Sequence, residues 1–290
     1  MWNRGRMEMR YLNRLKRRKS YKRIIQYFVL IIFLVISLYP IYFSIISSLK
    51  SSNEIFLNPF SFPTNPQVSN YINAFTNGNI GMYFKNSLIL TGLTLAVLFF
   101  VGTLASYVLA RFKFKMRTII FTMFISGMMI PIQSVIIPLS YLLGVLNLKN
   151  NYLVLILIYA AFQLPITIFI ITGFIKSLPK EIEEAAVMDG CGAFQVYWKI
   201  IVPLVIPGIV TALIFDFLNI WNNLLFPLVF ISDPKQQVIS MGLLSFSSMY
   251  TADYGGLMAG IVISIIPPVI IYMLLQEKVV KGITAGGVKG

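Results

Sequence analysis

Six long apolar stretches constrain the fold more than any other feature of this 290-residue chain. A helix needs about 20 apolar residues to cross the hydrocarbon core of a bilayer. Five of the stretches contain no Asp, Glu, Lys or Arg, and the remaining one contains only Asp216. We therefore predict an all-α membrane protein with six transmembrane helices. The predicted spans are residues 24–47, 86–110, 118–143, 152–175, 204–231 and 256–275.

Composition and proline placement agree with a membrane bundle. Charged residues make up 12% of the chain, against about 25% in a typical soluble domain. The first stretch is too long for a signal-peptide core and has no A-x-A site after it, so we predict an uncleaved helix. Prolines lie inside several spans. Bilayers tolerate such breaks where neighbouring helices or a cavity satisfy the freed carbonyls, which favours a bundle with a path through it over kinked helices with none.

The basic residues predict the orientation of the chain. A net charge of +14 would suit nucleic acid only on a basic face of a folded domain. Instead the basic residues flank the apolar stretches, and a cytoplasmic N-terminus puts 20 of the 24 on the inside. We expect a basic cytoplasmic segment at 1–23, a transmembrane domain at 24–275, a cytoplasmic tail at 276–290 and no nucleic-acid partner. We also expect the N-terminal cluster of basic residues to contact membrane lipid.

The residue types that are missing exclude most enzyme chemistry. The chain has no histidine, and its one cysteine, Cys191, allows neither an internal disulfide framework nor a cysteine-rich metal site. It also contains no G-x-x-x-x-G-K-[ST] string to cradle a nucleotide. We predict no catalytic residue, no metal and no cofactor bound by this chain.

The predicted cytoplasmic loop 176–203 has the pattern of a helix–turn–helix. Pro179 suits a first helical turn, and the glutamates that follow suit the positive end of the helix dipole. Gly190 is the expected stop. A second helix, Ala193 to Ile201, carries aromatic residues and should break at Pro203. Such a knob fits a groove on another protein, and an amphipathic loop resting on lipid headgroups is the alternative.

The string Glu184-Ala185-Ala186, followed at fixed spacing by Gly190, Ile200 and Pro203, resembles the EAA loop of binding-protein-dependent ABC permeases. It departs only at Val202, where the family usually has Leu. The resemblance covers all but residues 1–20 and points to the carbohydrate-uptake branch, like the second permease of maltose-type importers. The further strings that carry it are Asn70-Tyr71, Ala74-Phe75, Asn86-Ser87 opening the second span, Ala110-Arg111-Phe112, Met129-Ile130-Pro131, Trp221-Asn222 and the tail 282–290.

The resemblance implies a type I ABC importer permease fold in a bacterial or archaeal cytoplasmic membrane. The chain would form half of the pore for a sugar or related solute. The partners implied are a second permease, an extracytoplasmic substrate-binding protein and two ATPase subunits, which use ATP and magnesium. Gly286 and Lys289 resemble a tail segment near the ATPase interface. The residues implied to couple the chain to the ATPase are Glu184, Ala185, Ala186, Asp189, Gly190, Ile200 and Pro203.

Asp216 lies about twelve residues into its span, and at about 1.5 Å per residue this is near mid-bilayer. An ionisable group there is a functional-site candidate by default, and a packing residue between helices is the alternative. Positions 216 and 223 are seven apart and should share one helix face. Trp221 could stack on a sugar ring or simply pack. The candidate substrate path is Asp216, Asn219, Trp221, Asn222 and Asn223, with Gln133, Ser134 and Gln163 as weaker candidates.

Two other transporter classes stay open from the sequence. One is another ABC importer branch, for peptides, phosphate or amino acids, because the EAA string alone does not separate the branches. The other is an ion-coupled secondary transporter, which would need several intramembrane acids or cation-binding unwound helices, together with a repeat between halves. One intramembrane Asp and no visible repeat disfavour it.

Overall fold

Every regular element of the described chain is helical. The computed structural model describes the backbone of residues 2–246 and 253–287, and the side chains of 23–246 and 253–278. Four stretches in these ranges are long and apolar enough to cross a membrane, and two bent helix pairs raise the number to six if each pair is one span. The all-α membrane class is confirmed. The four unbroken stretches are Arg23–Ser47, Ile80–Arg111, Tyr152–Ser177 and Tyr254–Lys278.

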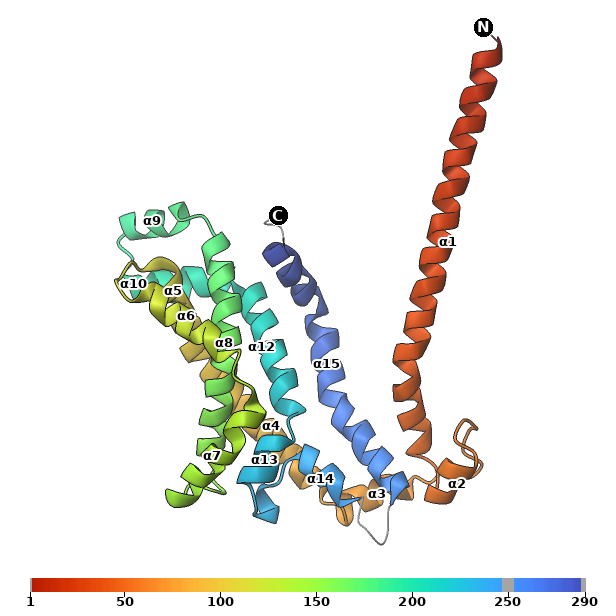
Figure 1. The fold of residues 1–290 in the computed structure, drawn as a ribbon, viewed down its shortest axis with the longest axis vertical. Coiled ribbons are helices and arrows are strands. Elements are labelled where there is room, and N and C mark those ends of the chain that lie inside the picture. The colour runs from red at the N-terminus through yellow and green to blue at the C-terminus, as the bar shows by residue number, and fades with distance from the viewer. Residues whose placement is uncertain (1, 247–252, 288–290) are drawn as a thin grey trace.

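The long helices run between two ends of the molecule, and the short helices lie at one end or the other (Figure 1). The first turns of α1 (Trp2–Ser47), the short helix α9 (Glu181–Met188) and the last turns of α15 (Tyr254–Gly287) lie toward one end. The short helices between the spans gather at the other end. These are α2 (Ser52–Leu57), α3 (Ser69–Thr76), α13 (Leu225–Phe230), η3 (Pro234–Gln236) and α14 (Ile239–Ser245).

The second span begins earlier than predicted. It runs through α4 (Ile80–Val97), the π-helical segment η1 (Leu98–Gly102) and α5 (Thr103–Arg111). Asn86 and Ser87 therefore lie inside the helix and do not open it, which corrects the predicted start at residue 86. The helix starts at Ile80 because Asn79, in the left-handed conformation at φ 52°, turns the chain into it.

The third span is not one helix over residues 118–143. It consists of α6 (Arg117–Gly127) and α7 (Ile132–Val145), bent by 95°. Pro131 occupies the N-cap of α7 in an extended conformation. Proline lacks a donor and disfavours helical geometry in the residue before it, so the helix ends and restarts here.

The fifth span is shorter than the predicted 204–231. The loop helix continues as α10 (Ala193–Val196), the π-helical η2 (Tyr197–Ile201) and α11 (Val202–Leu204), so Pro203 does not end it. The chain then bends by 75° into α12 (Ile206–Trp221). Pro207 in the first turn of α12 explains the restart, because its ring is pre-set for a helix start. Residues 222–224 separate α12 from α13.

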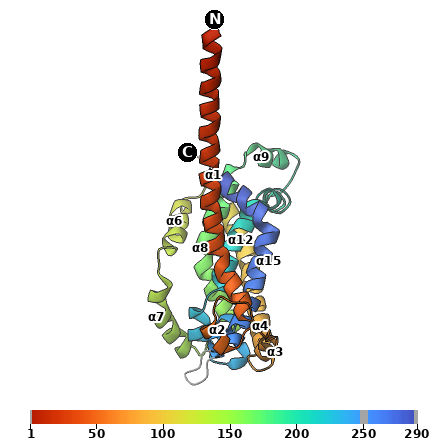
Figure 2. The same cartoon turned by 90° about the vertical axis from the view of Figure 1, so that its right-hand side faces the viewer.

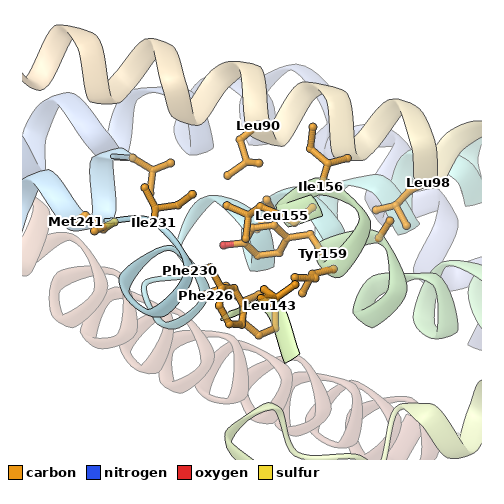
Figure 3. Packing of buried hydrophobic residues seen from close by; sticks show 14 residues of the cluster. Leu90, Leu98, Leu143, Leu155, Ile156, Tyr159, Phe226, Phe230, Ile231 and Met241 are labelled. Atoms are coloured by element: carbon orange, nitrogen blue, oxygen red, sulfur yellow. The ribbon is translucent and has the colours of Figure 1, made fainter. Parts of the chain in front are cut away.

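The helix α8 (Tyr152–Ser177) lies against α4, α5, α6 and α12 and forms the centre of the bundle. Figure 3 shows part of its core, in which Tyr159 packs among Leu90, Leu155 and Phe226. In contrast, α1 contacts α15 only near its own C-terminal end, and all of residues 23–42 are exposed. Figure 2 shows α1 extending past the rest of the molecule at its N-terminal end.

Candidate functional site

The α9–α10 hairpin projects at one end of the bundle (Figure 1). Its first helix starts at Glu181, after Lys180 at the N-cap, and has three glutamates in its first turn. Gly190 takes φ +85°, and its amide donates to the Val187 carbonyl at 3.0 Å. This left-handed turn, which glycine adopts without strain, confirms the predicted stop. The chain re-enters a helix after Gly192, whose amide donates to Gln195 Oε1 at 3.1 Å.

The hairpin exposes an acidic and apolar surface. Ala186 is the only buried residue of α9, whereas Met188 is 86% exposed and Phe194 of α10 is 71% exposed. A groove of about 630 Å³ runs beside them. It is lined by Tyr107, Phe112, Glu183, Glu184, Val187, Met188, Cys191, Ala193 and Val196.

The predicted EAA residues divide between this surface and the bundle. Glu184, Ala185, Asp189 and Gly190 are exposed, and Ala186 is buried. Ile200 is half-buried, and Pro203 is exposed. The hairpin therefore exposes an acidic face and packs against the bundle through small or apolar residues.

Aromatic residues fasten the second half of the hairpin to the second span. Tyr197 is buried, with 4% of its surface exposed. Its hydroxyl shares a hydrogen bond of 2.7 Å with Thr103 Oγ1. Trp198 is 43% exposed and packs against Phe99 and Phe100 of the second span. Two π-helical turns, η1 and η2, thus meet at this junction.

Arg111 ties the hairpin to two spans. Its Nε lies against the Glu183 carboxylate, and its Nη2 donates to the Leu178 carbonyl at 3.0 Å. Arg117 instead binds the end of α5 itself, donating from Nε to the Leu109 carbonyl at 2.8 Å. From the sequence, Arg117 was only a topology charge, and Arg111 was in addition part of a string that carries the family resemblance. The feature of the sequence that could have predicted this contact is the position of Arg111 at the end of a span, together with an acidic loop later in the chain.

Asp216 lies fully enclosed between α12 and α8, with 0% of its surface exposed. Its Oδ2 accepts a hydrogen bond of 2.7 Å from Thr167 Oγ1. Its Oδ1 has no hydrogen-bond partner among the described residues. In this structure Asp216 packs between two helices, and a functional role for it stays a prediction.

Trp221 and Asn223 hold neighbouring segments in place. Trp221 is 4% exposed, packs against Phe84 and Phe217, and donates from Nε1 to the Ser264 carbonyl at 3.1 Å. Asn223 accepts from the Phe226 amide at 3.0 Å. Because α12 ends at Trp221, Asn223 does not share a helix face with Asp216, and that prediction was wrong.

The remaining path candidates have free surface. Asn219 on α12 and Asn222 at its C-cap are exposed. Gln133 and Ser134 are exposed on α7, and Gln163 on α8 is half-buried. The structure therefore separates the candidates into an exposed set and an enclosed set, which the sequence could not do.

Hydrogen bonds at the opposite end of the bundle, which the sequence alone did not reveal, hold the segment before α14 in place. Asn86 Nδ2 donates to the carbonyls of Lys235 and Gln237 at 2.9 and 2.8 Å. Ser87 Oγ accepts from the Ile239 amide at 2.8 Å. Tyr152 donates to the Gln236 carbonyl at 2.6 Å. The Asn-Ser string, read as the opening of a span, thus fastens the segment before α14 to the second span.

Acidic, cysteine and histidine side chains do not gather within residues 23–246 and 253–278 in a group of three that could hold a metal. Of the two tail residues singled out from the sequence, Gly286 falls within α15, and Lys289 lies outside the described residues.

Comparisons with known proteins agree on one class. Residues 101–285 match the family described as binding-protein-dependent transport system inner membrane component. The diacetylchitobiose uptake system permease protein NgcG of Streptomyces coelicolor is 36% identical over 264 residues, 90% of this chain and 87% of that protein. The arabinooligosaccharides transport system permease protein AraQ of Bacillus subtilis is 34% identical over 87% of this chain and 91% of its own length.

The fold also matches a solved structure. A chain of a bacterial ABC transporter involved in the import of the acidic polysaccharide alginate superposes with a TM-score of 0.74, at 22% identity, over 88% of this chain and 95% of that one. The likeness is one of fold, and it extends over nearly the whole bundle.

Proposed function

Because this chain belongs to the family of binding-protein-dependent transport system inner membrane components, we propose that it forms half of the pore of an ATP-driven importer for an oligosaccharide or related solute. Family membership removes the ion-coupled secondary transporter from consideration. The observation that carries the proposal is the exposed α9–α10 hairpin, which bears the Glu184-Ala185-Ala186 and Gly190 string on a projecting knob. The sugar class is supported by relatives named for sugar uptake.

The knob is the proposed docking site for an ATPase subunit. Glu181, Glu184 and large apolar side chains, including Met188 and Phe194, lie on the outside with a groove beside them. Helices with this pattern insert into grooves of partner proteins. Two ATPase subunits, one for each half of the pore, would bind ATP and magnesium. Glu184, Ala185, Asp189 and Gly190 are the proposed contact residues.

A second permease chain is proposed to cover the free apolar faces. Residues 24–42 of α1 are exposed on every side of the helix, including Phe33 at 67% and Ile36 at 64%. The bent span α6–α7 also exposes large residues, such as Ile137 at 77% and Tyr141 at 76%. Lipid covers part of such surfaces, but a half-pore needs a partner across its path.

The exposed asparagines are the proposed solute contacts. Asn219 and Asn222 offer amide donors and acceptors suited to sugar hydroxyls. Asp216, Trp221 and Asn223 stay in the proposed path region as residues that shape it, since their polar atoms already bind other helices.

The proposed orientation puts the hairpin end in the cytoplasm of a bacterial or archaeal cell. The first turns of α1 and the last turns of α15 lie toward that end (Figure 1). The segments assigned to that side by sequence carry 20 of the 24 basic residues, as the positive-inside rule requires. An extracytoplasmic binding protein would deliver solute at the opposite end.

The test is to purify the tagged chain from its native membrane and identify what copurifies. A second multi-span chain and an ATPase should be found, and the reconstituted complex should take up labelled oligosaccharides when its binding protein and Mg-ATP are present. Replacing Asn219 and Asn222 with alanine should raise the solute concentration for half-maximal uptake. Absence of both partners, or uptake that needs no ATP, would refute the proposal. Uptake of peptides or phosphate in place of sugars would assign the chain to another importer branch.

A further inference from the structure

Arg111 stands where three helices end or begin. It is the last residue of α5, its Nη2 binds the carbonyl of Leu178 at the C-cap of α8, and its Nε lies against Glu183 in the first turn of α9. The side chains of Arg111 and Glu183 are only 9% and 13% exposed. Water therefore screens this pair less than it screens a surface pair.

The hairpin helix α9 has little else to hold it. Ala186 is its only buried residue, and alanine contributes a small apolar area. On its far side the chain turns through Gly190, which lies at φ +85° and has no side chain to pack against the bundle. The forked contact of Arg111 is thus the main polar link between α9 and the spans.

We propose that Arg111 is a positioning residue that makes α9 move as one body with α5 and α8. This inference rests on the proposed function, in which an ATPase pushes on the hairpin. A push on a helix held only by Ala186 would tilt that helix locally. The planar guanidinium binds two acceptors at once in fixed geometry, so the same push is passed to the ends of two spans.

The α5 end supplies a matched control. Arg117 is also a half-buried arginine that donates to backbone carbonyls of α5, namely those of Leu109 and Ala110. It has no hydrogen bond to α9 among the described residues. Removing Arg117 therefore perturbs the same helix end without releasing α9.

The experiment uses the purified importer complex in proteoliposomes and measures ATP hydrolysed per solute taken up. We expect Arg111→Ala and Glu183→Ala each to raise this ratio by about fivefold or more, the range of a typical coupling energy. The double variant should be no worse than either single one, because both remove the same link. Arg117→Ala should leave the ratio unchanged. Arg111→Lys keeps the positive charge but cannot bind two acceptors in fixed geometry. Its ratio of ATP hydrolysed to solute taken up should lie between the ratios of the wild type and Arg111→Ala.

Amide hydrogen exchange of residues 181–190 in the same complexes gives a second readout that needs no transport. Exchange should speed up in Arg111→Ala and stay unchanged in Arg117→Ala. If Arg111→Ala does not assemble, Glu183→Gln provides the same comparison with a smaller change. Unchanged exchange and an unchanged ratio in the assembled variant would overturn the inference. Failure of the wild-type complex to import with ATP would instead refute the proposed function, and the exchange result would still decide whether Arg111 holds α9.

Discussion

Replacing Thr167 with valine should destabilise the bundle by a predictable amount. The Thr167 hydroxyl is fully buried and donates to Asp216 Oδ2 at 2.7 Å, while Asp216 Oδ1 has no partner among the described residues. Valine keeps the shape of threonine but leaves the carboxyl with no donor. An unsatisfied buried polar group costs about 1–3 kcal/mol, whereas hydrogen bonds between membrane helices average about 0.6 and reach about 1.7 kcal/mol. We therefore expect a loss of about 1–2 kcal/mol.

Thermal unfolding of the full chain in its detergent-solubilised complex measures this loss. A chain of this size loses about 2–4 °C in Tm for each kcal/mol, so Thr167→Val should unfold about 2–8 °C earlier. Thr172→Val is the matched control, because Thr172 is equally buried on the same helix and its hydroxyl has no hydrogen-bond partner in the part of the chain that the structure describes. That variant should be neutral or slightly stabilising. Equal shifts in the two variants would show that the Thr167–Asp216 bond contributes nothing, and the reasoning would fail.

Three further predictions follow from named contacts. Trp221→Phe keeps the aromatic packing but leaves the Ser264 carbonyl without its indole donor. Tm should therefore fall by an amount that corresponds to about 1 kcal/mol, and an unchanged Tm would contradict this prediction. Asn86→Ala frees two loop carbonyls, and hydrogen exchange in the segment before α14 should speed up while exchange in α9 stays constant. Gly190→Val places a branched side chain at φ +85°, which costs about 1–2 kcal/mol. ATP-driven uptake by this variant should drop well below that of the control Gly192→Ala, because the backbone at Gly192 has φ −72°. Equal uptake by the two variants would refute the role of the turn.

Much of the fold could be predicted because it depends on local properties. Apolar length and the scarcity of charge identify membrane helices without any knowledge of their neighbours. The hairpin was equally readable, since prolines, a run of glutamates and Gly190 act within a few residues of their own position. The errors fell at helix ends, at Pro131, Pro203 and Trp221, where a break depends on how the next segment packs.

The sequence by itself determined the helical membrane class, the exposed acidic hairpin and the positions of the charges, because each follows from residues close together in the chain. Only the tertiary structure decided what the polar residues do. Arg111 meets Glu183 across 72 positions, and Asn86 meets Gln237 across 151. Asp216 proved enclosed and Asn219 exposed, although both lie in the same apolar stretch. The physical reason is that a helix face has no fixed environment until the other helices pack against it.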